Sequence, residues 1–267
     1  NKLMPIHLII HNLKTIKIMG KLKSFIKLEG TLDGLTFYKS QDGYLVRTKG
    51  GISKNRILKD PAFKRTRENF KQFGLNAKAG ALLRDSVGPI LAKAKDSKLS
   101  SRMLKLMSDI KNFDSTSVRG QRSVHLGLAT AEGKQLLKGL DFNGRAHLQL
   151  VLNANFSVDT TTGVIEIPDF TTQEQLAATE GATHVSFRTA FVNLNFETGF
   201  FNTIYSPVVM LPIDLIMSTV TLTPDGVPAG DGIQLHLLLI EFYQEMNGVQ
   251  YPLLNGAHNV LNLVEVV

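Results

Sequence analysis

The stretch VSFRTAFVNLNF, residues 185–196, alternates apolar and polar side chains and predicts a β-strand. Similar patterns occur before and after it in the chain, at residues 147–152, 164–167, 208–211, 216–222, 233–243, 249–253 and 260–266. Turn residues separate these segments, as in Asp159–Gly163, Pro224-Asp225-Gly226 and Asn247-Gly248. Strands at this spacing predict an antiparallel β-sandwich, Ig-like or jelly-roll, over residues 146–267.

The chain from residue 19 begins with a different β pattern. Period-two alternation predicts a strand over 21–29, and β-forming residues predict two more over 35–39 and 44–49. The glycine-rich segment 30–34 and the Asp42-Gly43 pair are typical of the turns between them. These residues predict a small β-meander.

Helical patterns follow the meander. Asp60-Pro61 is a helix start, since Asp caps free N–H groups and Pro suits the first turn. We expect helices over 62–73 with Gly74 as the stop, over 75–95 with a break near Gly88-Pro89, from Ser100 or Ser101 through Ile110, and over 129–138. The predicted fold class is α+β, in which a small N-terminal β-meander and a helical basic region precede the sandwich.

Charge is distributed very unevenly along the chain. Residues 1–145 hold 29 of the 30 Lys and Arg side chains and 11 of the 23 acids, which is a net charge of +18. Residues 146–267 hold one Arg and 12 acids, a net charge of −11. We therefore predict a domain over 19–145, a second domain over 146–267, and a leader or upstream extension over 1–18. The asymmetry predicts an anionic partner for the basic half, or attraction between copies of the chain.

The sequence lacks the residues and motifs that several kinds of catalytic and metal-binding site require. Without cysteine the chain has no disulfides, thiolate metal sites or cysteine nucleophiles. The sequence carries no G-x-S-x-G elbow, P-loop or dinucleotide fingerprint. Of its seven histidines, only His7 and His11 have a spacing that suits a metal, and the nearby Pro5 argues against a zinc site there. No apolar run reaches the length of a bilayer. We predict a protein that is not an enzyme, binds no metal or cofactor and has no membrane span.

A cluster of basic residues gives the candidate contact site. Its members lie within eighteen residues of sequence and are Lys54, Arg56, Lys59, Lys64, Arg65, Arg67 and Lys71. The charges fit either a phosphate-contacting face or a solvated helix face. For the interleaved Phe63, Phe70 and Phe73 we expect positions in the core.

The N-terminal motifs carry a family resemblance. The stretch LEGTLDGLTFY at 28–38, with YLVR at 44–47, KGG at 49–51 and DPAFKRTREN at 60–69, resembles a family of uncharacterised proteins common in Bacteroidetes genomes. The likeness covers roughly residues 19–142. It implies a bacterial or bacteriophage origin, and it implies no activity or site residue.

Three functions fit these observations. The first, which we favour, is a self-assembling structural protein such as a virion, tube or surface-filament subunit, in which the basic half of one copy meets the acidic half of another. The second is a nucleic-acid-binding protein that uses its basic half. The third is a sandwich module for a ligand or carbohydrate, against which the absence of tryptophan counts. We expect a homo-oligomer, with nucleic acid or another anion as a further partner.

Overall fold

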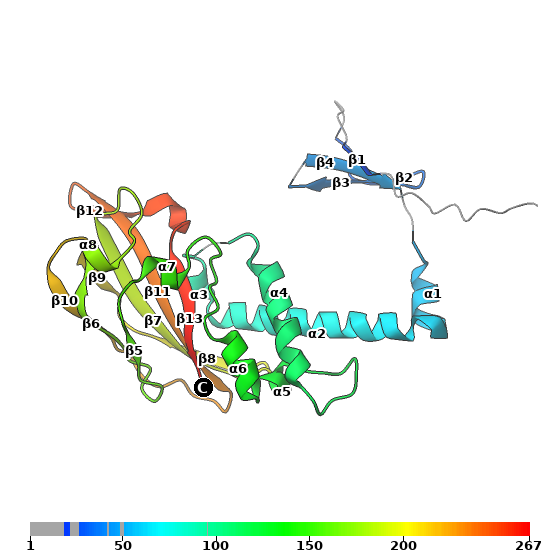
Figure 1. Ribbon diagram of the computed structural model, residues 1–267. Helices are drawn as coiled ribbons and strands as arrows, with labels where there is room; N and C mark the ends of the chain where they lie inside the picture. Colours follow the sequence, from blue (N-terminus) through cyan, green and yellow to red (C-terminus); the bar gives the residue numbers. More distant parts are fainter. Residues whose placement is uncertain (1–18, 22–26, 42, 49–50, 95) are drawn as a thin grey trace, which may run out of the picture. The chain divides into compact units, whose positions relative to one another are not determined.

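The computed structural model describes residues 19–21, 27–41, 43–48, 51–94 and 96–267 (Figure 1). The chain divides into two compact units, Asn1–Lys64 (unit 1) and Arg65–Val267 (unit 2). The predicted leader at 1–18 lies outside the described residues. The predicted domain boundary at 145/146 does not separate compact units, because residues on both sides of it pack into one core of unit 2.

Unit 1 holds one small antiparallel sheet and a short helical segment. The strand order is β1-β4-β3-β2, and the elements are β1 (Met19–Lys21), β2 (Gly30–Leu32), β3 (Leu35–Ser40), β4 (Gly43–Thr48), α1 (Lys54–Lys59) and the 3-10 helix η1 (Pro61–Phe63). The strands predicted over 35–39 and 44–48 are confirmed. Of the strand predicted over 21–29, residues 22–26 lie outside the described residues and 27–29 form no strand.

The turn between β2 and β3 is tighter than the sequence pattern suggests. Leu32 pairs with Leu35, so that only Asp33 and Gly34 make the turn, with φ of 45° and 78°. Two positive φ angles are what a two-residue hairpin turn requires, and Asp-Gly supplies them at low cost. Gly30–Leu32, predicted as part of the turn, is therefore free to pair as β2.

Unit 2 is built on a central antiparallel sheet. Its path is β12-β11-β7-β8, with β13 also paired to β11 and β9 also paired to β7. These strands are β7 (His184–Leu194), β8 (Phe201–Tyr205), β9 (Val209–Pro212), β11 (Ile233–Met246), β12 (Val249–Pro252) and β13 (Val260–Val266). The Asn247-Gly248 hairpin between β11 and β12 is confirmed, with Met246 paired to Val249 and positive φ at both turn residues.

Helices cover one face of the central sheet (Figure 1). They are α2 (Lys64–Ser86), α3 (Gly88–Leu91), α4 (Leu99–Ile110), η2 (Lys111–Phe113), α5 (Val124–Leu128) and α6 (Ala131–Leu137). Leu83, Met103 and Met107 from these helices share one hydrophobic core with Leu237 and Leu263 from the sheet. Because helices and sheet bury each other, a boundary at 145/146 would divide a single core.

A second, smaller sheet covers the other face. Its order is β10-β6-β5, formed by β5 (Ser157–Val158), β6 (Ile165–Thr171) and β10 (Met217–Leu222). Ile165 and Val220 of this sheet pack in one core with Phe187 and Ile240 of the central sheet. Two sheets packed over a shared core form the β-sandwich-like region of an α+β protein, as the sequence predicts.

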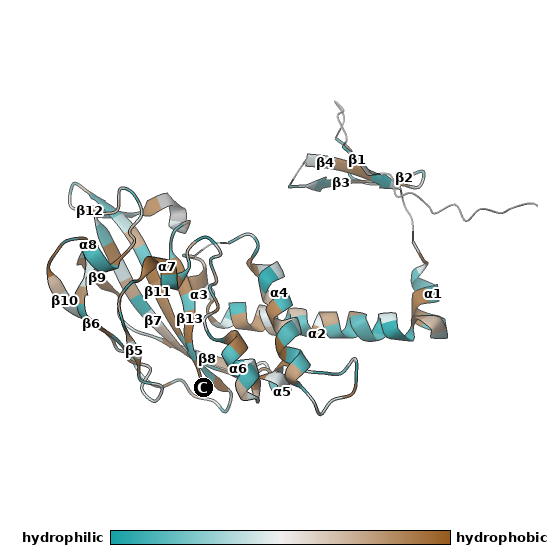
Figure 2. Ribbon diagram, in the orientation of Figure 1, coloured by the Kyte–Doolittle hydropathy of each residue, from teal (hydrophilic) through white to brown (hydrophobic). Residues whose placement is uncertain are grey.

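Burial on both faces explains the sequence of β11. Leu235, Leu237 and Leu239 face the helices, while Leu238 and Ile240 face the small sheet. Every residue from 235 to 242 is buried, and Figure 2 shows β11 as largely hydrophobic. Continuous apolar runs are typical of strands that are covered on both sides.

Two predicted elements are wrong in kind or extent. α2 runs through Gly74 without a stop, because its packed stripe of Gln72, Asn76, Gly80 and Leu83 continues across that point. The predicted strand at 147–152 is instead the short helix α7 (Leu148–Val151), capped by Asp141, whose Oδ1 accepts the N–H of Leu148 at 3.1 Å.

The break near Gly88-Pro89 is confirmed, since α2 ends at Ser86 and α3 begins at Gly88. The remaining short helices are α8 (Thr172–Gln175) and η3 (Leu253–Gly256).

Two helical glycines, Gly127 at a close helix contact and Gly74 in open space, give a prediction for the stability of the fold. A Cβ at Gly127 of α5 would stand 2.3 Å from the carbonyl oxygen of Ile110, whereas a Cβ at Gly74 would meet nothing within 4 Å. We expect Gly127→Ala to lower the free energy of unfolding by about 1–3 kcal/mol through overpacking. Gly74→Ala should raise it by about 0.5–1 kcal/mol through helix propensity. Urea unfolding followed by circular dichroism measures both, and equal effects of the two variants would contradict the packing.

Candidate interaction surfaces

The sheet of unit 1 has one apolar face without a cover. Register places Leu32, Leu35, Phe37 and Val46 on the same side, because Leu32 pairs with Leu35 and Phe37 pairs with Val46. Leu32 is 63% exposed, and no described residue of unit 1 is buried. A single sheet of short strands needs a second layer to bury its apolar side chains. Among the described residues, unit 1 does not supply one.

The opposite face of this sheet is mixed, because Leu45 and Tyr38 lie there beside Thr36 and Arg47. The guanidinium of Arg47 lies over the Tyr38 ring at 5.3 Å, and the hydroxyls of Thr31 and Thr36 lie 3.2 Å apart. Residues 1–64 hold 13 Lys and Arg side chains and four acids, a net charge of +9. Unit 1 therefore combines an uncovered apolar face with a large positive charge.

The predicted basic residues fall into two sets. Lys54, Arg56 and Lys59 lie on α1 of unit 1, while Lys64, Arg65, Arg67 and Lys71 lie in the first turns of α2. Arg56 is engaged locally, since its Nε is 3.2 Å from Asp60 Oδ2 and its guanidinium lies over Phe63 at 5.8 Å. In the described part of the chain, no ion pair involves Lys54, Lys59, Lys64, Arg65 or Lys71, and all five are exposed.

The expectation that Phe70 and Phe73 are core residues is wrong. Each is 60% exposed, because the packed stripe of α2 runs through Gln72 and Asn76 and leaves both rings to one side. Phe63 is only partly buried. Figure 1 shows the N-terminal turns of α2 extending beyond α4 and α5, and Figure 2 shows that these turns are mostly hydrophilic. Exposed aromatic rings among cations make this end of α2 a candidate contact surface.

The small sheet carries the opposite charge on its outer side. Glu166 of β6 is exposed between the buried Ile165 and Ile167, and Glu174 of α8 is exposed as well. At the start of β10 the chain exposes three consecutive apolar residues, Leu215, Ile216 and Met217, of which Ile216 is 72% exposed. Residues 146–267 contain a single Lys or Arg, Arg188. This surface is thus acidic and apolar, complementary to that of unit 1.

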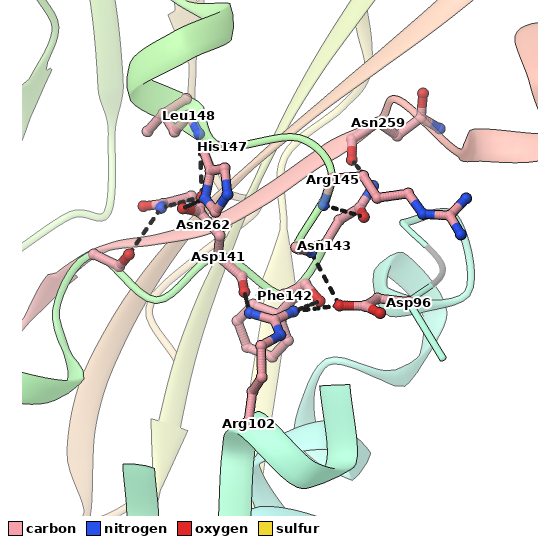
Figure 3. A network of polar contacts seen from close by, with 12 residues as sticks. Asp96, Arg102, Asp141, Phe142, Asn143, Arg145, His147, Leu148, Asn259 and Asn262 are labelled. Atoms are coloured by element: carbon pink, nitrogen blue, oxygen red, sulfur yellow. Dashed lines mark hydrogen bonds and ion pairs between the residues drawn. The ribbon is translucent and has the colours of Figure 1, made fainter. Parts of the chain in front are cut away.

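A polar network joins the helices to the sheet (Figure 3). Arg102 of α4 donates to the carbonyl oxygens of Asp141 and Phe142, both at 2.9 Å, and forms an ion pair with Asp96. Asn143 Nδ2 donates to the carbonyl oxygens of Ala257 and Asn259 at 3.0 and 2.9 Å. Asp96 Oδ2 also accepts the N–H of Gly144 at 3.0 Å. The network holds the segment 141–144 in place between α4 and β13.

Asp141 and His147 form the arrangement closest to a catalytic pair. His147 Nδ1 lies 2.8 Å from Asp141 Oδ2, and the His147 side chain is half-exposed. Asp141 also accepts from Asn262 Nδ2 at 2.7 Å, and Figure 3 shows both contacts. A nucleophile would have to meet the other ring nitrogen, and within the described residues no hydrogen bond joins that nitrogen to a hydroxyl group. Through Asp141, the pair holds the start of α7 in place.

Two of the buried ionisable groups, Asp114 and His236, lie outside the predicted contact site. Asp114 is 1% exposed, and its carboxylate accepts the N–H groups of Thr116, Ser117 and Ser123 at 2.9–3.0 Å. His236 is fully buried and stacks on Phe191, with ring centroids 4.4 Å apart. The Asp-x-Thr-Ser order at 114–117 is typical of an Asx turn, and this pattern could have pointed to the hydrogen-bonding role of Asp114. The apolar run around His236 is consistent with its burial, but the local sequence does not show that its ring nitrogens lack hydrogen-bond partners.

None of the helices in the described ranges combines the length and apolar character needed to cross a membrane. Within the same ranges, no three His, Asp or Glu side chains gather closely enough to hold a metal ion. No protein-family model, curated protein or solved structure matches this chain. The resemblance to uncharacterised Bacteroidetes proteins therefore stays a prediction.

Proposed function

We propose that this protein is a self-assembling structural subunit whose copies join head to tail. In the proposed contact, the sheet of unit 1 from one copy packs on the small acidic sheet of the next copy. The observation that carries the proposal is the unit 1 sheet itself, which exposes Leu32 and Leu35 and has no buried residue among those described. A second layer supplied by a neighbouring copy would complete its packing.

Charge and surface chemistry support this pairing. Unit 1 has a net charge of +9, whereas the segment 146–267 has a net charge of −11. Leu215, Ile216 and Met217 supply apolar area beside the acids Glu166 and Glu174. Opposite charges would steer and orient the contact, while apolar burial would stabilise it.

The two surfaces differ, so the contact would be heterologous. Each copy offers one basic surface and one acidic surface, and binding leaves both ends of a dimer able to bind again. Heterologous contacts close into rings or extend as filaments, according to the rotation between copies. The proposed function is accordingly that of a subunit in a ring, tube, filament or shell.

Charge reversal on each surface tests the proposal. We expect light scattering to show large particles at low salt that shrink as the salt concentration rises, because exposed charges are screened. Replacing both Leu35 and Lys39 by Glu on the apolar face of the unit 1 sheet, or both Glu166 and Glu174 by Lys on the small sheet and α8, should leave monomers. An equal mixture of these two variants should associate again, since each variant retains one intact surface and the two reversed surfaces carry opposite charges. Lys98→Glu, a reversal at an exposed lysine of unit 2, is the control and should assemble as the unmodified chain does.

Electron microscopy of the same samples distinguishes regular rings or filaments from amorphous aggregates. A monomer at every salt concentration would refute the proposal. Particles that persist unchanged in both double variants would refute the head-to-tail contact.

A further inference from the structure

Two adjoining hollows lie between α2, α4 and the loop 118–122 of unit 2. One has a volume of about 470 Å³ and lies between α2 and α4. The other has a volume of about 290 Å³ and lies between α2, η2 and the loop. They share the lining residues Asn69, Gln72 and Lys111, and we treat the two adjoining hollows together as one groove. The groove lies wholly within unit 2 and is independent of the proposed assembly contact.

The loop end of the groove is cationic. Lys111, Arg119 and Arg122 line it together with one acid, Glu68. Glu68 Oε2 lies 3.7 Å from Arg119 Nε, and Gln72 Nε2 donates to the carbonyl oxygen of Arg122 at 2.5 Å. Arg122 Nε is buried and has no hydrogen-bond partner among the described residues.

Burial, and next the charge of Arg122, lower the pKa of Lys111, while Asp109 opposes the shift. Lys111 and Arg122 line the same partly buried hollow, and the acids near them are Asp109 and Glu68. Such an arrangement is relieved when an anionic group binds to both, as a phosphate does.

The side chains at the α4 end of the groove suit the binding of a flat ring with polar edges. Phe73 lines this end with an exposed ring, and Leu104 adds apolar surface. Asn76 lines it too. Its side chain is 2% exposed, and its Oδ1 has no hydrogen-bond partner among the described residues. Single-stranded nucleic acids are recognised by stacking on aromatic rings and by hydrogen bonds to base edges, and this end of the groove offers the Phe73 ring and the unpaired Asn76 Oδ1.

We infer that this groove binds a nucleotide unit, with the base stacked on Phe73 and the phosphate held by Lys111, Arg119 and Arg122. The unit can come from single-stranded nucleic acid or from a free nucleotide. Lys105 of α4 also lines the groove and supplies a further cation for the phosphate of a neighbouring unit. That further cation favours a strand.

Fluorescence anisotropy tests the inference with a fluorescein-labelled oligothymidylate of about 12 nucleotides, within the range of known single-strand sites. Adenosine monophosphate and inorganic phosphate serve as competitors. Displacement of the oligonucleotide only by unlabelled oligonucleotide supports a strand. Displacement by adenosine monophosphate at similar concentrations supports a free nucleotide. Displacement by phosphate as readily as by the mononucleotide, or no binding of any probe, overturns the inference.

Variants separate the groove from the general basic charge of the chain. We expect Phe73→Ala to weaken oligonucleotide binding about tenfold through lost stacking, and Phe73→Tyr to restore it. Arg122→Gln should weaken binding and reduce its salt dependence. Phe200→Ala and Lys98→Gln, at exposed positions outside the groove, are the controls. Equal effects of groove and control variants would overturn the assignment of the site. Light scattering of the same variants reports assembly separately, so that failure of one proposal is not mistaken for failure of the other.

Discussion

Replacement of Asp114 by alanine is expected to lower the free energy of unfolding by about 3 kcal/mol, since hydrogen bonds to a buried charge contribute about 1.5–3 kcal/mol each and the loop can recover part of the loss. The Asp114 carboxylate accepts three backbone N–H groups, and Oδ1 also accepts the Thr116 hydroxyl at 2.9 Å. These bonds fix the turn at 114–117 and tie it to Ser123, the N-cap residue of α5. Without the carboxylate, the donors lose their partner at a buried position.

The pH dependence of Asp114 has a definite sign. Burial raises the pKa of Asp114, but the hydrogen bonds from Ser123, Ser117 and Thr116 outweigh it and hold the pKa well below its ordinary 3.8. The carboxylate therefore stabilises the fold fully above the pH at which the unfolded group titrates, and this contribution declines as the pH falls below about 4.

Urea unfolding at high salt, followed by far-ultraviolet circular dichroism, measures the effect of the substitution. Asp225→Ala is the matched control, because Asp225 is exposed and its side chain forms no ion pair or hydrogen bond with described residues. Equal stabilities of the two variants would contradict the role of Asp114.

Replacement of His236 by phenylalanine is expected to remove an acid sensitivity of the whole fold. Burial lowers the pKa of His236 from 6.5 to about 4, against the opposing effects of Glu265 and Asp159. The unfolded chain takes up a proton near pH 6.5, whereas the folded chain does so only near pH 4, so the folded state loses stability as the pH falls between these values. The loss amounts to about 3 kcal/mol, because each pH unit in this window costs about 1.4 kcal/mol.

His236→Phe should also raise stability at neutral pH. Neither ring nitrogen of His236 has a hydrogen-bond partner among the described residues, and an unsatisfied buried polar group costs about 1–3 kcal/mol. Phenylalanine keeps the stacking on Phe191 and removes that cost. Stability measured from pH 7 to pH 4 gives both results, with His258→Gln as a control at an exposed histidine. A variant that loses stability with acid as steeply as the unmodified chain would contradict this account.

The strands of unit 2 were the most predictable part of the fold. β6, β7, β9, β10, β11, β12 and β13 all fall within or close to predicted segments, because period-two patterns and Asn-Gly or Asp-Gly turns act locally. β8 was not predicted. Its five residues, Phe201–Tyr205, are exposed or only partly buried along the edge of β7 and show no clear alternation.

The candidate surfaces were predictable in charge and not in shape. The sequence shows the basic cluster, but it predicts no helix at 54–59, where the structure has α1. It does not show that Phe70 and Phe73 are exposed, because the face that α2 buries depends on where α4 lies. Gly80 illustrates this, since a Cβ there would stand 2.8 Å from Met103 Cγ of α4.

By itself the sequence determined the α+β class, most strands, the helix break at Gly88-Pro89 and the separation of charge along the chain. These features depend on side-chain periodicity, backbone preferences and composition, which are properties of neighbouring residues. Only the tertiary structure decided that the helices and the central sheet share one core, that 148–151 is a helix and that His236 is buried without a partner. Each of these depends on contacts beyond neighbouring residues, such as that of Asp141 with Asn262, 121 positions later, and no local pattern encodes them.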